Sequence, residues 1–252
     1  MDTIHHERML AYLRAHVTLR LLTHLPADDV RAAAPGRLTI GLRTPGGPAC
    51  QIRIADGRIE FIDRPRVYPS VTLFFPRPAH LVSTLTGGRG PVIPIPAGLK
   101  VLRGIGAFRA LTAKLQERFA DAAMRPHLLL LATLYGVEEV ANRDPYVAAR
   151  VKRIPEGSLS VRIAGDGAGW VQKSGRSLRT GSGDLPPGVA RANAELEFAD
   201  DQAAIDLLTG ACPAMLALAE RRVRLHGRLP MIQNLFPVLD RVSDYLSDVR
   251  KG

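Results

Sequence analysis

Seven histidines and two cysteines are the residues of this chain that could bind a metal ion or act in catalysis. A structural zinc site needs four such ligands, usually at short spacings. His5 and His6 are adjacent, so on a helix their side chains point apart. The other histidines stand apart from any patterned cysteine or carboxylate: His16, His24, His80, His127 and His226. The spacing therefore predicts no metal site and gives no support for a catalytic histidine.

The two cysteines, Cys50 and Cys212, lie far apart in the sequence. Their spacing fits neither a disulfide framework nor a zinc ribbon. We expect two free, partly buried thiols. A Cys50 nucleophile served by a distant histidine stays open as an alternative, although a lone thiol in a strand is usually structural.

Two glycine-rich segments could suggest a nucleotide site. Gly104-Ile-Gly106 lacks the third glycine of the dinucleotide fingerprint, and Gly181-Ser-Gly183 runs into Asp-Leu-Pro-Pro instead of a helix. The chain also contains neither a P-loop nor a GxSxG nucleophile motif. We therefore expect no cofactor and no enzymatic activity.

The composition is that of packed globular protein. The 252 residues, of which 46% are hydrophobic and 5% aromatic, allow one or two domains. The densest apolar run, Leu128 to Leu134, is too short for the roughly 20 residues that cross a bilayer. The N-terminus carries Asp2 and Glu7 and lacks the order of a secretory signal. We expect a cytoplasmic protein in which this apolar run forms a buried helix.

The chain is basic, with 34 Lys and Arg against 24 Asp and Glu, a net charge of +10. Such a charge attracts phosphate-bearing partners, either anionic lipid or nucleic acid. The densest basic groups, Arg150–Arg153 and Arg221–Arg224, are short, and charge runs are usually solvated. The charge alone does not choose the partner.

An internal repeat is the main signal of the sequence. Sliding the chain by 123 residues superimposes two alternating, strand-like segments and two copies of Leu-Thr-Gly. The matching positions are 71–75 with 194–198, 85–87 with 208–210, Leu102 with Leu225, Gly104 with Gly227, and Arg118 with Arg241. Upstream, with a shift of 121, the segment from Gly36 matches the segment from Gly157. A duplication of one structural unit follows from this pattern.

Each unit is predicted to contain two strands, a tight turn, a third and a fourth strand, a helix, a fifth strand and a long final helix. Asp56-Gly57 and Ser174-Gly175 suit the tight turns. Gly87 and Gly210 suit the left-handed ends of the short helices. Apolar residues at helical spacing predict the final helices, and further helices are expected at 7–24 and 126–141. We place the boundary between the units near residue 122.

The second unit resembles the sterol carrier protein family. The resemblance is clearest from Ala194 to Gly210, AELEFADDQAAIDLLTG, and from Arg221 to Leu229, RRVRLHGRL. It covers residues 36–119 and 157–247. It implies an α/β (α+β) fold with two tandem sterol-carrier-like domains, 1–122 and 123–252, each a roughly five-stranded, mainly antiparallel sheet covered by helices.

The first unit departs from the family pattern at Pro91 to Gly98, PVIPIPAG. Pro94 and Pro96 would break a regular helix, so we expect an extended segment there. The second unit has CPAMLALAE in this place, which suits a short helix. The two units are therefore expected to differ in the shape of their pockets.

In the family the domain encloses an apolar tunnel for sterols, fatty acyl chains or similar lipids, and no catalytic residues accompany it. The resemblance thus implies non-enzymatic binding or transfer of an apolar lipid in a pocket within a domain. Ordinary core packing is the alternative for each lining candidate. The candidates are Phe61, Phe75, Leu85, Ile93, Leu111 and Leu115 in the first unit, and Trp170, Phe198, Leu208, Met215, Leu218 and Leu235 in the second.

Basic residues are candidates for contact with an anionic membrane or a ligand head group. They are Arg103, Arg109, Arg118, Arg221, Arg222 and Arg228. One alternative function is a ligand-free scaffold in a lipid or quinone biosynthesis complex, with a protein partner. A nucleic-acid binder is disfavoured for single strands because aromatic residues are scarce among the basic groups. The sequence leaves the ligand's identity and the oligomeric state open.

Overall fold

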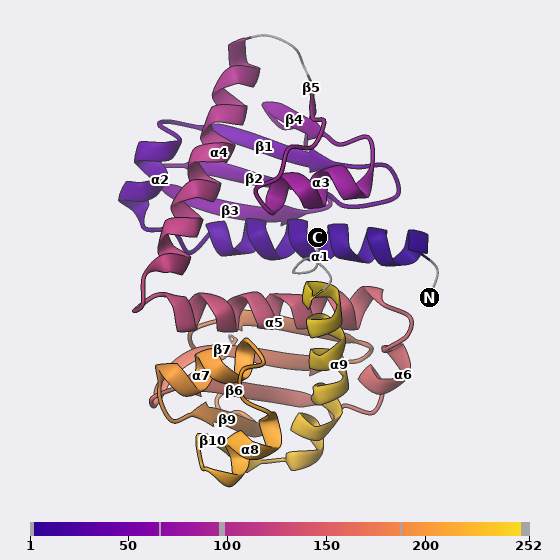
Figure 1. The fold of residues 1–252 in the computed structure, drawn as a ribbon, viewed down its shortest axis with the longest axis vertical. Coiled ribbons are helices and arrows are strands. Elements are labelled where there is room, and N and C mark those ends of the chain that lie inside the picture. The colour runs from indigo at the N-terminus through magenta and orange to yellow at the C-terminus, as the bar shows by residue number, and fades with distance from the viewer. Residues whose placement is uncertain (1–2, 66, 96–98, 187, 248–252) are drawn as a thin grey trace. The chain divides into compact units, whose positions relative to one another are not determined.

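The computed structural model describes residues 3–65, 67–95, 99–186 and 188–247. Its contacts divide the chain into two compact units, Met1–Ala120 (unit 1) and Asp121–Gly252 (unit 2). This division falls two residues before the predicted boundary (Figure 1).

The elements of unit 1 are α1 (Thr3–Leu22), α2 (Ala27–Ala33), β1 (Leu38–Arg43), β2 (Ala49–Ala55), β3 (Arg58–Asp63), β4 (Val71–Phe74), α3 (Pro78–Leu85), β5 (Ile93–Ile95) and α4 (Leu99–Ala120). The elements of unit 2 are α5 (Arg125–Arg143), α6 (Ala148–Val151), β6 (Gly157–Ile163), β7 (Asp166–Ser174), β8 (Ser177–Ser182), β9 (Ala194–Phe198), α7 (Asp201–Leu208), α8 (Ala214–Ala219), β10 (Val223–Gly227) and α9 (Leu229–Ser247).

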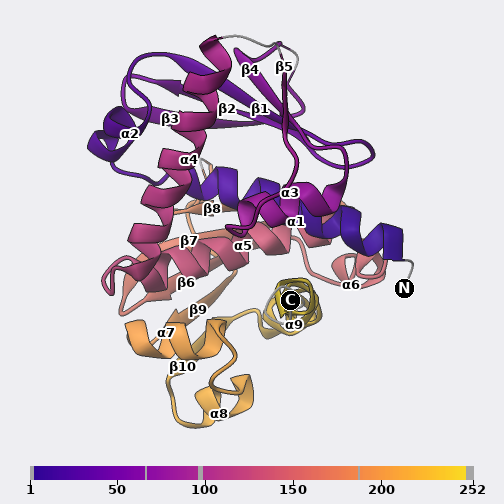
Figure 2. The same cartoon turned by 45° about the horizontal axis from the view of Figure 1, so that its top comes forward.

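Both units have the same sheet connectivity over their described residues. The strand orders are β3-β2-β1-β4-β5 and β8-β7-β6-β9-β10. In the first sheet β1 and β4 pair in parallel, and in the second sheet β6 and β9 pair in parallel. The other neighbouring strands of both sheets pair antiparallel. Helices lie on one side of each sheet, as Figures 1 and 2 show. The predicted α/β class, with two five-stranded, mainly antiparallel sheets covered by helices, is confirmed.

Alternating side chains build the core between each sheet and its helices. In β1, Ile40 and Leu42 are buried, and in β6, Leu159, Val161 and Ile163 are buried in the same alternation. We call the opposite side, which the helices leave uncovered, the outer face. Arg43 in β1 and Arg162 in β6 have the opposite parity and therefore point to the outer face.

The turn predictions hold with one correction. Asp56 and Gly57 have φ of +54° and +76° and connect β2 to β3. In unit 2, Ser174 pairs with Ser177, so the turn consists of Gly175 and Arg176, one residue later than predicted. Gly87 and Gly210 are left-handed, as predicted, just after α3 and α7.

The repeat with a shift of 123 was predicted to continue through the fifth strand, and this is wrong. Leu102 and Gly104 lie in helix α4, whereas Leu225 and Gly227 lie in strand β10. The fifth strand of unit 1 is β5, in the segment predicted to be extended, of which residues 96–98 lie outside the described residues. Ile95 pairs with Thr72, and His226 pairs with Glu195. The equivalent positions Ile95 and His226 are therefore 131 residues apart in the sequence. The eight additional residues of unit 2 accompany helix α8, which was predicted correctly.

Helix α5 protects the edge of the second sheet. Asn142 exchanges hydrogen bonds with the backbone of Leu178 in β8, at 2.7 and 2.9 Å. Glu138 accepts from the backbone N–H of Thr180 at 2.8 Å. An unpaired edge strand is a template for aggregation, and these side chains occupy its hydrogen-bonding groups.

An arginine of the last helix is anchored to an aspartate in both units. Arg118 of α4 donates to Asp29 at 2.6 and 2.9 Å. Arg241 of α9 donates to Asp144 at 3.1 Å, and Tyr245 donates to the same oxygen at 2.8 Å. Arg118 and Arg241 are partners in the sequence repeat, but their acceptors come from different elements, Asp29 from α2 and Asp144 from the end of α5.

Candidate ligand-binding sites

Each unit has a hollow on the outer face of its sheet. The chain leaves the third strand at one side of the sheet and returns as the fourth strand beside the first. The described residues between these strands are 64–65 and 67–70 in unit 1, and 183–186 and 188–193 in unit 2. We call them the crossing segments. The groove of unit 1 has a volume of about 820 Å³, and the pocket of unit 2 about 640 Å³. Both volumes suit a small organic ligand.

The groove of unit 1 has largely apolar walls. Phe74 and Ile95 belong to its floor, and Val67, Tyr68 and Pro69 of the crossing segment belong to its rim. Ile95 is 51% exposed and Val67 73% exposed. Exposed apolar surface of this kind marks a binding site more often than an isolated exposed residue does.

A glycine lets the crossing segment approach the sheet of unit 1. A Cβ atom at Gly41 in β1 would lie 2.7 Å from Cγ of Pro69. Two arginines also belong to this groove, Arg43 at the end of β1 and Arg64 at the start of the crossing segment. Both are exposed; Arg64 lies 4.0 Å from the carboxylate of Asp63, and Arg43 forms no ion pair within the described part of the chain. The groove thus combines apolar walls with positive charge.

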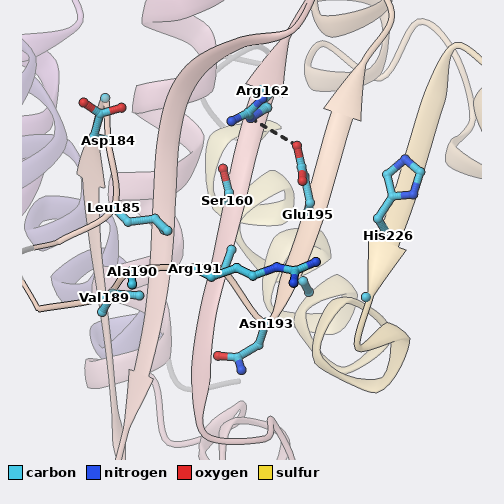
Figure 3. Close-up of a pocket in the computed structure, with 14 residues that line it drawn as sticks. Ser160, Arg162, Asp184, Leu185, Val189, Ala190, Arg191, Asn193, Glu195 and His226 are labelled. Atoms are coloured by element: carbon cyan, nitrogen blue, oxygen red, sulfur yellow. Dashed lines mark ion pairs between the residues drawn. The ribbon is translucent and has the colours of Figure 1, made fainter.

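The pocket of unit 2 is polar. Figure 3 shows Ser160 and Arg162 on β6, Glu195 on β9 and His226 on β10, with Arg191 extending from the crossing segment. Arg162 and Glu195 form an ion pair of 3.1 Å. Asn193 accepts a hydrogen bond from the backbone N–H of Ser158 at 2.9 Å and so fastens the end of the crossing segment to β6.

The predicted apolar lining residues do not line either hollow in the described part of the chain. Phe75, Leu111, Leu115, Phe198 and Leu235 are buried in the cores. The half-buried candidates are Phe61, Leu85, Trp170, Leu208 and Leu218. Ile93 and Met215 are 49% and 78% exposed, and their contact with a ligand stays a prediction.

The physical reason is that apolar alternation marks a buried side chain and does not measure unfilled space. Sequence reasoning missed Phe74 and Ile95, which do line the groove. One signal for them was present: Ile95 has the same parity as the candidate Ile93, and both are isoleucines beside prolines in a short extended segment.

Two of the predicted basic contacts are engaged inside the protein. Arg118 pairs with Asp29, and Arg222 pairs with Asp206. Their charges are offset by these carboxylates, and their contact with a membrane or a head group stays a prediction. Arg103 is exposed and donates to the carbonyl of Pro35. The remaining candidates are exposed: Arg109, Arg221 and Arg228.

Comparison with known proteins finds similarity to solved structures alone. No protein-family model matches the chain, and no curated protein sequence matches it significantly. The chain is similar to a solved structure described as UbiJ-SCP2 ubiquinone synthesis protein, with a TM-score of 0.33 and 17% identity over 45% of this chain and 96% of that chain. At this TM-score the description of the fold continues to rest on the topology above. None of the described helices has the length and hydrophobicity to traverse a bilayer.

Proposed function

We propose that the two units are sterol-carrier-like domains and that the chain is a non-enzymatic binder of an apolar lipid. The observation that carries the proposal is the groove of unit 1, where apolar side chains stay exposed around about 820 Å³ of space. A fatty-acyl, sterol-like or isoprenoid ligand would remove Phe74, Ile95 and Val67 from water, at roughly 25 cal/mol per Å² of apolar surface. Arg43 and Arg64 would meet a negatively charged end of such a ligand.

The groove is tested by placing a charge in it. Ile95→Asp puts a carboxylate on the floor at a half-exposed position, where the fold tolerates it. We expect at least a tenfold loss of affinity for a fluorescent fatty acid, measured by titration of the purified protein. Leu102→Asp on α4, where the side chain is 69% exposed and outside the groove, is the matched control and should bind as the unchanged protein does. Equal binding by all three proteins would refute the groove as the site.

Native mass spectrometry of the purified protein, followed by organic extraction, identifies a carried ligand. A lipid at one per chain that is lost in Ile95→Asp supports the proposal. Protein that carries no lipid and takes up no fluorescent fatty acid, sterol or isoprenoid would favour the scaffold alternative. The specific observation for that alternative is Tyr68, which is 94% exposed on the rim of the groove and suits contact with a protein.

We also propose a peripheral membrane contact at helix α8. Met215 and Leu216 are 78% and 47% exposed on this helix, and Arg221 follows it, also exposed. Apolar side chains beside a positive charge suit the surface of an anionic bilayer. The extra residues that carry α8 have no counterpart in unit 1, so the contact is expected of unit 2 alone.

The double variant Met215→Asp, Leu216→Asp tests this contact. We expect it to lose most co-flotation with vesicles that contain an anionic phospholipid, because two carboxylates oppose both insertion and attraction. Leu102→Asp again serves as the control and should still float with the vesicles. Retention of the double variant on the vesicles would exclude α8 as the contact.

A further inference from the structure

The hollows of the two units lie at equivalent places, but different chemistry lines them. Pairing registers define the equivalence: Gly41 pairs with Thr72, which pairs with Ile95, and Ser160 pairs with Glu195, which pairs with His226. Thr72 and Ile95 of unit 1 therefore correspond to Glu195 and His226 of unit 2. The exposed isoleucine of the groove thus corresponds to a histidine of the pocket, and the threonine beside it to a glutamate.

The charges in the pocket of unit 2 leave one arginine available. Arg162 is neutralised by Glu195 at 3.1 Å. Arg191 is exposed and forms no ion pair within the described ranges of the chain, and Figure 3 shows its guanidinium group extending over β6 toward β9. Asp184, the other acidic residue of the lining, lies at the opposite end of the pocket from Arg191 and His226. The end that holds Arg191 is therefore positive.

Donors at this end come from several elements. Ser160 and Arg162 stand on β6, His226 on β10 and Arg191 on the crossing segment. A phosphate group accepts hydrogen bonds in several directions, and arginine is its preferred partner because its guanidinium can donate two parallel hydrogen bonds. A carboxylate, whose two oxygens lie in one plane, can accept from fewer of these donors than a phosphate group can.

We propose that the pocket of unit 2 binds the phosphate group of a small polar ligand, with Arg191 as its main charge partner. Ser160, on the strand over which Arg191 extends, would hydrogen-bond another oxygen. The rest of the 640 Å³, with His226 two strands away on β10, would hold the body of the ligand. This site is separate from the apolar groove of unit 1 and does not depend on it. A phosphorylated metabolite and a phospholipid head group share this chemistry.

The only tryptophan of the chain provides a local signal. Trp170 on β7 pairs directly with Ser160 and therefore stands on the same outer face. Titrations would use glycerol 3-phosphate and inorganic phosphate at constant ionic strength, with tryptophan fluorescence and calorimetry as independent readouts. Acetate would serve as the carboxylate comparison. We expect saturable binding of glycerol 3-phosphate and a weaker response to acetate.

Arg191→Gln should weaken the binding of glycerol 3-phosphate at least tenfold. Arg176→Gln removes the same charge from the exposed β7–β8 turn, outside the pocket, and should leave binding unchanged. Binding to vesicles of phosphatidic acid is compared with binding to vesicles of phosphatidylcholine. Binding to phosphatidic acid that depends on Arg191, together with weak binding of the soluble phosphate, would identify a phospholipid head group as the ligand. Equal weakening by both glutamine variants, or absence of saturable binding to every phosphate probe by calorimetry, would overturn the proposal. Fatty-acid binding is measured on the same two variants and should be unchanged in both, so that a failure of the phosphate site is distinguished from a failure of the groove of unit 1.

Discussion

Asp144→Ala is expected to lower the unfolding free energy of unit 2 by about 3 kcal/mol, the lower end of the cost of breaking a buried ion pair. The side chain of Asp144 is fully buried, and that of Arg241 is 20% exposed. Without the carboxylate, Arg241 and the hydroxyl of Tyr245 lose their shared acceptor. The guanidinium group of Arg241, which also lies 4.7 Å from the ring centre of Tyr245, keeps a charge that water reaches only in part.

Urea unfolding followed by the fluorescence of Trp170 measures this loss in unit 2. Asp29→Ala in unit 1 is the matched variant, since it removes the equivalent anchor of Arg118. There the two side chains are 18% and 34% exposed, so we expect a cost of about 1 kcal/mol or less, read from hydrogen exchange of unit 1. Equal costs in the two units would contradict the role of burial.

The Asp144 anchor also predicts a dependence on pH. Burial by itself raises the pKa of Asp144, but hydrogen bonds from the backbone of Tyr146, from Tyr245 and from Arg241, together with the charge of Arg241, lower it below its ordinary value of 3.8. A carboxyl group with a lowered folded pKa stabilises the fold above its unfolded pKa and loses this contribution as the pH falls through the folded pKa. The stability gap between the unchanged protein and Asp144→Ala should therefore be constant near neutral pH and narrow only below about 3.8.

Two glycines of helix α4 are expected to respond to alanine with opposite signs. A Cβ atom at Gly104 would lie 2.3 Å from Cγ1 of Val71, a fully buried residue of β4. At Gly106 a Cβ atom meets nothing within 4 Å. Gly106→Ala should stabilise unit 1 by up to about 1 kcal/mol through helix propensity, whereas Gly104→Ala adds overpacking of about 1–3 kcal/mol that outweighs this gain.

Hydrogen exchange of α4 and β4 in unit 1, with urea unfolding followed by circular dichroism, measures both glycine variants. We expect their unfolding free energies to differ by about 1–3 kcal/mol, the overpacking cost alone, because both variants share the gain in helix propensity. Two stabilised variants would show that α4 does not approach β4 as closely as Gly104 indicates.

The local elements were predictable because their signals are local. Alternating apolar residues, left-handed glycines and helical spacing depend on neighbours a few residues away. They located the first four strands of both units, the turn at Asp56-Gly57 and the helices that end before Gly87 and Gly210. The same reasoning failed at Leu102 and Gly104, because an ungapped shift cannot show that unit 2 has gained residues around α8.

Most elements of this protein, the similarity between its two units and the apolar character of its cores follow from patterns in the sequence alone. The tertiary structure alone decided where ligands can bind, because the hollows form where a crossing segment meets a sheet face that the helices leave uncovered. Ser160, Arg191 and His226 are far apart in the chain, and strand pairing together with the crossing segment brings them to one pocket. Phe74 and Phe75 are adjacent, yet Phe75 is fully buried and Phe74 lines the groove, since successive side chains of an extended chain point to opposite faces.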